Sequence, residues 1–359
     1  MNAIHTLGWA LVHSLWQDAL AAAGLASLLT LVPARAARVR YALAALTLAI
    51  MLALPLATAL RLDAASDAAM PALAAPALTS LVDRIRAGLE PTLPWIVALW
   101  LGGVLVMSAR LASGWATTRR LATAGTRPVS EAWRQALARL ARRLRVSRPV
   151  RLVASALIHV PAVIGWWRPV ILIPLSLLTG SGLTPLQLDA LLAHELAHVR
   201  RHDYLVNLLQ TVVETLLFYH PAVWWVSTRV REEREHCCDD LAVAACGDAH
   251  FYAMALLDME HLRVAAPRLA LAAGGGSLVG RIQRLVAPAQ VETFPRWIAG
   301  LVVAALALAI GGGTGLASRT ERFEARTHLP PSVVGADAGR TAPDTVLRYP
   351  GPARSLAER

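Results

Sequence analysis

The sequence predicts a mainly α-helical membrane protein with about four transmembrane helices and one further domain that mixes helices with a small sheet. Hydrophobic residues make up 56% of the 359 residues, and the mean hydropathy is +0.48, which exceeds the range of soluble proteins. Long uncharged runs lie towards both ends of the chain. An arginine-rich middle part with strand-like and helical patterns separates them.

The apolar runs define the membrane segments. We expect a membrane domain at residues 1–116, a mixed domain at 117–295 and a flexible tail at 319–359. The membrane domain is expected to hold three spans, and a fourth follows the mixed domain; the spans lie at about residues 4–32, 41–60, 91–109 and 296–318.

The charge distribution predicts an orientation. The chain carries 35 basic residues, all of them arginine, against 24 acidic ones, for a net charge of +11. Residues 33–40 and 110–151 are densely basic, whereas the loop 61–90 is balanced. The positive-inside rule then places the N-terminus outside, the mixed domain on the cytoplasmic side and the tail outside.

A basic amphipathic helix is expected after the third span. Ser130 is its predicted N-cap, and Trp133, Leu137, Leu140 and Leu144 share one side of it. Because it follows a membrane span, we interpret this helix as lying on an anionic lipid surface, with membrane lipid as its partner. Direct binding of nucleic acid is disfavoured, because the arginines lack the context of a recognition helix.

Three short strands are predicted next, at residues 150–154, 160–164 and 170–173. A strand just before a catalytic helix can take up an extended peptide along its open edge. On this interpretation Ile164 and Gly165 bind substrate. The alternative is a hairpin that only supports the fold.

The central motif is His194-Glu195-Leu196-Ala197-His198, an H-E-x-x-H pattern in an apolar helical run. Thr184 as N-cap, Pro185 and Gln187 predict where the helix begins. His194 and His198 lie four residues apart on one helical face and can bind one Zn²⁺. Glu195 is then placed to act as general base towards the water that the ion activates. Two histidines on a solvated helix face are the alternative.

A second helical pattern supplies the third ligand. Glu235 and Asp239 are also four residues apart, and we predict that Glu235 completes a two-histidine, one-glutamate site. Asp239 is expected to accept the free ring N–H of a metal-bound histidine. The rival acids are Glu214, Glu232, Glu233 and Asp240. Cys238 is a further alternative ligand, although a reduced, buried thiol explains it equally well.

The combined motifs resemble those of the BlaR/MecR-type integral membrane zinc metallopeptidases, the antirepressor sensor-transducers of beta-lactam resistance and their relatives. The resemblance spans roughly residues 8 to 245. It rests on the H-E-x-x-H motif and on five other stretches: His13-Ser14-Leu15-Trp16-Gln17, Ile164-Gly165-Trp166 with Arg168-Pro169, Arg200-Arg201-His202-Asp203-Tyr204, Phe218-Tyr219-His220-Pro221 and Glu235-x-x-Cys238-Asp239. The best-known members carry a penicillin-binding sensor domain after their last membrane helix, and we expect this chain to lack one.

The resemblance implies a zincin-like α+β metallopeptidase domain that faces the cytoplasm of a bacterium from its inner membrane. It also implies an activity: hydrolysis of a cytosolic transcriptional repressor, or of the protein itself, during transmembrane signalling. The external signal would be read by the loop 61–90, the tail or a partner, and a homodimer is a further expectation. The alternatives are a non-proteolytic transducer with a structural or vestigial zinc site and a transporter, which is disfavoured because no repeat is visible.

Overall fold

The computed structural model describes residues 3–65, 84–158, 160–165, 167–178, 183–265 and 278–286. All of them lie in one compact unit, Met1–Ala307, and a second unit, Leu308–Arg359, lies outside the described residues. The expected fourth span at 296–318 and the expected tail at 319–359 also lie outside the described residues.

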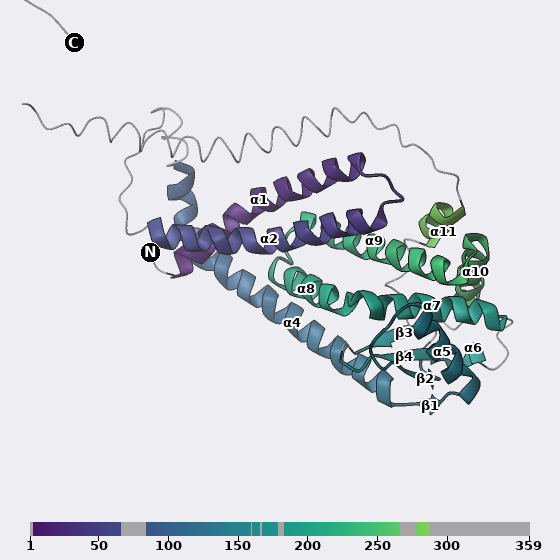
Figure 1. The fold of residues 1–359 in the computed structure, drawn as a ribbon. Helices are drawn as coiled ribbons and strands as arrows, with labels where there is room; N and C mark the ends of the chain where they lie inside the picture. The colour runs from purple at the N-terminus through teal and green to yellow at the C-terminus, as the bar shows by residue number, and fades with distance from the viewer. Residues whose placement is uncertain are drawn as a thin grey trace, which may run out of the picture. The chain divides into compact units, whose positions relative to one another are not determined.

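The N-terminal part consists of three long helices, α1 (Ala3–Leu31), α2 (Ala37–Ala65) and α4 (Leu93–Thr123), with the short 3₁₀ helix η1 (Glu90–Thr92) before α4. α1 and α2 pack as a hairpin, and α4 packs against α1 (Figure 1). α4 continues well past its predicted end at residue 109 and ends at Thr123, shortly before Gly125, which adopts a positive φ.

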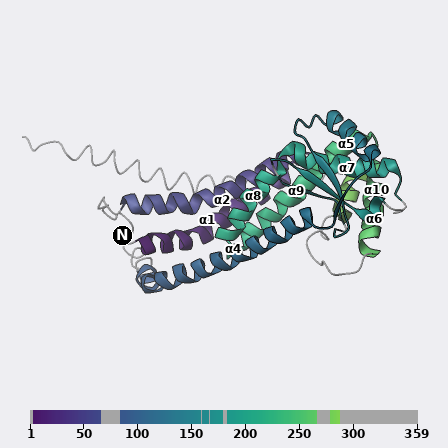
Figure 2. The same ribbon diagram turned by 90° about the horizontal axis from the view of Figure 1, so that it is seen from below.

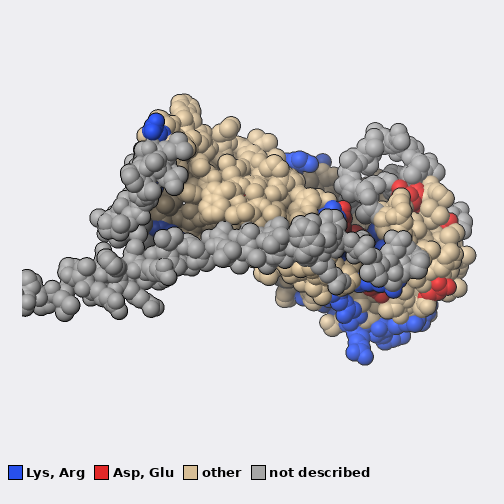
Figure 3. Space-filling model, turned by 90° about the horizontal axis from the view of Figure 1, so that it is seen from above, with Lys and Arg blue, Asp and Glu red and all other residues tan. Residues whose placement is uncertain are grey.

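Two helical segments of the described chain are long and apolar enough to cross a membrane, Ala37–Asp63 and Arg84–Arg120. A third is added if the bent pair Pro221–Cys246 and Ala249–His261 forms one span. α1 is helical as predicted but is not among these candidates. Side chains such as Leu99, which is 78% exposed, point outwards, and Figure 3 shows an uncharged surface over much of the helical part. The chain is therefore a membrane protein.

The three predicted strands are confirmed, and a fourth precedes them. β1 (Thr126–Pro128), β2 (Arg151–Ser155), β3 (Ala162–Ile164) and β4 (Val170–Pro174) form one sheet in the order β1-β2-β4-β3. β2 and β4 are parallel, with Leu152 opposite Ile171, whereas β1 and β3 pair antiparallel with their neighbours. β3 is consequently an edge strand, as its proposed role in substrate binding requires.

The sequence predicts that the basic helix lies on the lipid surface with its apolar side. That prediction is wrong, because this side packs against the protein core. Helix α5 (Glu131–Arg143) begins after Ser130 as predicted, although the Ser130 side chain makes no capping hydrogen bond. Leu137 and Leu144 are buried in the core that the sheet shares with α7, and Trp133 and Leu140 pack against it. The amphipathic pattern identified a face that needs cover, but it could not tell lipid from protein.

The remaining helices are α6 (Leu175–Leu178), α7 (Pro185–Arg201), α8 (Asp203–Leu216), α9 (Pro221–Cys246), α10 (Ala249–Ala265) and α11 (Leu278–Val286). α7 packs between α5 and α9, while α9 also packs along α2 and α8. Figures 1 and 2 show the sheet, α5, α7 and α10 together at one end of α2, α8 and α9. α9 thus links the α1–α2 hairpin to the part of the chain that carries the histidines.

Candidate metal centre

Helix α7 presents the two predicted histidines on one face. It begins with the predicted capping box, in which the Thr184 side chain accepts from the Gln187 backbone and the Gln187 side chain accepts from the Thr184 backbone. The apolar residues around the motif, such as Leu192 and Leu196, are buried in or beside the core that the helix shares with the sheet. This packing fixes the rotation of α7 and turns His194 and His198 towards α9.

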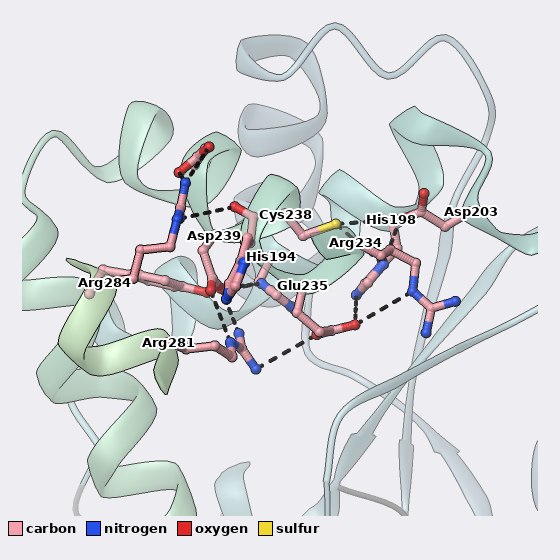
Figure 4. Close-up of polar contacts among 12 residues, drawn as sticks. His194, His198, Asp203, Arg234, Glu235, Cys238, Asp239, Arg281 and Arg284 are labelled. Atoms are coloured by element: carbon pink, nitrogen blue, oxygen red, sulfur yellow. Dashed lines mark hydrogen bonds and ion pairs between the residues drawn. The ribbon is translucent and has the colours of Figure 1, made fainter. Parts of the chain in front are cut away.

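Glu235 on α9 meets both imidazoles. Its Oε2 lies 3.4 Å from Nε2 of His194, and its Oε1 lies 3.9 Å from Nε2 of His198 (Figure 4). One ligand atom from each of the three residues can be chosen so that all lie within 4.8 Å of one another. The predicted ligand set is therefore brought together in space.

The rival acids of the sequence are engaged elsewhere. Glu232 pairs with Arg229, and Glu233 with Arg40 and His236. The remaining two are Glu214, which bonds Ser227 and Arg231, and Asp240, which pairs with Arg284. Among the four rivals, none faces the histidine pair.

The second ring nitrogen of His194 faces a polar network. The Tyr252 hydroxyl donates its proton to Oδ1 of Asp239 at 2.7 Å and lies 2.9 Å from Nδ1 of His194. Because the hydroxyl has only one proton, it accepts from Nδ1–H, so Nε2 is the ring nitrogen that can bind a metal. Asp239, the predicted acceptor of this ring N–H, lies 3.3 Å from the same Nδ1, and the Tyr252 hydroxyl lies closer.

Arg281 on α11 holds this carboxylate in place. Its Nε and one terminal nitrogen donate to the two oxygens of Asp239 at 2.9 and 2.6 Å. Its other terminal nitrogen lies 3.6 Å from Glu235. A bidentate arginine fixes the plane of a carboxylate, so α11 orients the outer partner of His194.

His198 has a carboxylate partner of its own. Nδ1 of His198 lies 2.8 Å from Oδ2 of Asp203, and the Cys238 thiol contacts both groups, at 3.3 and 3.4 Å. The chain reverses at His202, which takes the left-handed conformation and brings Asp203 back over the motif. His198, Asp203 and Cys238 form a second group of possible metal-binding residues, in which Asp203 and Cys238 contact Nδ1 of His198 and not the Nε2 that faces Glu235.

The electrostatics of the centre suit a cation. Burial lowers the pKa of the His194 imidazole, but its contacts with Asp239 and Glu235 outweigh that effect and raise the pKa to about 9. For the Asp203 carboxyl, burial acts to raise the pKa, but the contacts with His198 and Arg201 outweigh it and lower the pKa overall. The carboxylates therefore stabilise positive charge between the rings, so the donor set and its surroundings fit a bound Zn²⁺.

A pocket of about 440 Å³ opens onto this centre. Its walls include Glu195 beside the two histidines, and Ala162, Val163 and Gly165 from the edge strand and the turn after it. Gly165 has a φ of +87°, which only glycine adopts freely. Of the two residues predicted to bind substrate, Gly165 lines the pocket, whereas Ile164 is not among its lining residues.

Sequence reasoning missed three residues of the centre as participants: Asp203, Tyr252 and Arg281. Asp203 stood within a quoted motif, but no spacing rule linked it to His198. Tyr252 and Arg281 lie on other helices, and nothing in their local pattern distinguishes them. Of the aromatic and histidine side chains in the stretches that carry the resemblance, Tyr204 lines the pocket, while Tyr219 bonds Ser14 and His220 caps α9.

The chain combines apolar helices able to cross a membrane with a pocket that holds two histidines and a glutamate. These features define the class of the protein as a membrane protein with a metallopeptidase-type site. The chain belongs to the BlaR1 peptidase M56 family, whose model matches residues 28–285. It is similar to the regulatory protein BlaR1 of Bacillus licheniformis, at 31% identity over 96 residues. This match covers 27% of the chain and only 16% of that relative. The resemblance predicted from the motifs is confirmed.

Proposed function

We propose that this protein is an integral membrane zinc metalloendopeptidase that takes part in transmembrane signalling. The observation that carries the proposal is the approach of Glu235 to Nε2 of both His194 and His198, while Glu195 lines the same pocket. A purely structural zinc site has four protein ligands and needs no adjacent base. This ligand set leaves a position open towards the pocket.

The chemistry follows from the placement of the residues. Zn²⁺ held by His194, His198 and Glu235 supplies activation of water and polarisation of a peptide carbonyl. The Glu195 carboxylate takes a proton from the attacking water and delivers it to the leaving amine nitrogen. The open edge of β3 binds the substrate in extended form through backbone hydrogen bonds and holds the scissile bond beside the histidines.

The finer expectations also belong to the proposal. The substrate is a cytosolic transcriptional repressor or another copy of the protein itself, as in antirepressor signalling. The site faces the cytoplasm of a bacterial inner membrane that the chain crosses four times. The arginine-rich residues 33–40 and 110–151 support this orientation, because positive charge is retained on the cytoplasmic side.

Replacement of the base tests the activity. We expect Glu195→Gln to retain zinc and to lower the cleavage rate at least about 100-fold, because the variant cannot move the proton. Protein fragments are compared in membrane and cytosolic fractions of cells that carry the wild type or the variant. Glu232→Gln is the matched control, since Glu232 pairs with Arg229 away from the pocket. An unchanged fragment pattern in Glu195→Gln would favour the non-proteolytic transducer.

A further inference from the structure

Two adjacent residues of a candidate membrane span reach the helices that carry the metal ligands. Arg40 and Tyr41 lie one turn into α2, within the segment Ala37–Asp63 that is apolar enough to cross a membrane. Arg40 contacts α9, which carries Glu235, and Tyr41 contacts the end of α7, which carries both histidines.

The contact of Tyr41 leads to His198 in three steps. The Arg201 guanidinium lies over the Tyr41 ring, 4.5 Å from its centroid. Arg201 also lies 3.2 Å from Oδ1 of Asp203, whose other oxygen lies 2.8 Å from Nδ1 of His198. The position of the Tyr41 ring therefore constrains the guanidinium that orients the carboxylate partner of His198.

The contact of Arg40 leads to Glu235. Nε of Arg40 donates to Glu233 at 2.6 Å, and Glu233 lies two residues before Glu235 on α9. The same guanidinium donates to the backbone carbonyls of Leu29 and Val32, where α1 ends. The Glu233 side chain is only 3% exposed, and Arg40 compensates its charge together with His236, which lies 3.3 Å from its other oxygen. The turn of the α1–α2 hairpin is thereby fastened to the helix of the third ligand.

We propose that Arg40 and Tyr41 are positioning residues that couple the membrane hairpin to the metal centre. A shift of α2 relative to α7 and α9 alters the orientation of His198 and Glu235 and so changes the affinity of the centre for zinc. The inference rests on the proposed function, because it assigns the zinc centre to His194, His198 and Glu235. It adds a physical route by which an event at the membrane reaches that centre.

The test measures zinc affinity of the purified full-length chain in detergent by competition with a chromophoric chelator. We expect Tyr41→Leu to weaken zinc binding about fivefold, because Arg201 loses the ring that holds it. Tyr41→Phe is the matched control and should bind zinc like the wild type, since it keeps the ring under Arg201. Arg40→Met should also weaken binding, whereas Arg38→Met, at an exposed neighbouring position, should not.

A double-mutant cycle separates the relay from general destabilisation. Arg201→Met should weaken zinc binding as Tyr41→Leu does, and the pair together should add little, because both changes break the same chain of contacts. The coupling would be overturned if the losses of zinc affinity in the two single variants added up in the double variant. It would also be overturned if Tyr41→Leu bound zinc like the wild type and only lowered the melting temperature. A wild-type chain that binds no zinc would overturn the proposed function as well. Asp203→Asn removes the charge of the His198 partner itself; if that variant lost zinc affinity while the Tyr41 and Arg201 variants kept it, only the coupling through Tyr41 and Arg201 would be overturned.

Discussion

At the scale of single residues, the centre is organised by what the outer ring nitrogens contact. Nδ1 of His194 donates to the Tyr252 hydroxyl and Nδ1 of His198 lies against Asp203. Both contacts engage Nδ1, so Nε2 is the ring nitrogen that can bind a metal, and both Nε2 atoms face Glu235. The ligand atoms are thus orientated before any ion binds, which reduces the entropy lost on binding.

Tyr252 provides a direct test of this arrangement. Tyr252→Phe removes only the hydroxyl, so Nδ1 of His194 keeps Asp239 at 3.3 Å but loses its closer partner. We expect zinc affinity to fall about tenfold, in the range found for the outer partners of metal-bound histidines. Competition with a zinc chelator measures the change. Tyr204→Phe, at an exposed position of the pocket, serves as the control, and equal affinities in the two variants would contradict the role of Tyr252.

At the scale of elements, the contact between α4 and the turn from α8 to α9 depends on a glycine. Trp100 of α4 donates to the carbonyl of Leu216 at 2.8 Å, and the Phe218 ring lies directly against Gly103. A Cβ at Gly103 would overlap that ring, whereas one at Gly102 would meet nothing within 4 Å. The absence of a side chain at residue 103 therefore lets α4 approach the turn.

The two glycines form a matched pair for mutation. Gly103→Ala should lower the melting temperature of the purified protein, because the new methyl group displaces Phe218 and separates α4 from α8. Gly102→Ala should leave it unchanged or raise it slightly, since alanine favours a helix over glycine by about 0.5–1 kcal/mol. Thermal unfolding in detergent gives both values. Equal melting temperatures would show that the Phe218 contact does not hold α4 in place.

The elements also show which features a sequence can predict. The capping box at Thr184, the pair His194 and His198, and the three strands follow from local spacing, and the structure has them where they were expected. The burial of the apolar side of α5 against the protein core could not be predicted, nor could Tyr252 as the partner of His194 or Arg281 as the partner of Asp239. They depend on how helices distant in sequence pack, and neither an amphipathic pattern nor a lone arginine specifies its partner.

At the scale of the whole molecule, the described chain combines apolar helices able to cross a membrane, a sheet with β3 at its edge and a polar centre between two helices. The sequence predicts Glu235 as the third ligand but leaves four other acids as rivals, and only the three-dimensional structure shows where those acids lie. Each of those acids has its own arginine, histidine or serine partner, which the sequence alone does not reveal. The orientation in the membrane still rests on the arginine distribution.

Labelling of introduced cysteines tests that orientation. Asp63→Cys, at the far end of α2, should react with a membrane-impermeant maleimide in intact spheroplasts. Arg134→Cys on α5 should react only after lysis, because the arginine-rich side is retained in the cytoplasm. Of the native cysteines, Cys237 and Cys238 are buried and Cys246 is partly exposed, so the background is measured on the wild type. The reverse labelling pattern would place the centre outside the cell.

The most direct test of the account is the X-ray absorption spectrum of zinc bound to the purified protein. We expect one zinc ion per chain with nitrogen and oxygen neighbours at about 2.0–2.2 Å, from His194, His198 and Glu235. Glu235→Gln should weaken binding, whereas Glu232→Gln should leave the spectrum unchanged. A sulfur neighbour at about 2.3 Å would place Cys238 in the ligand set, and this result, or wild-type protein without zinc, would contradict the proposed centre.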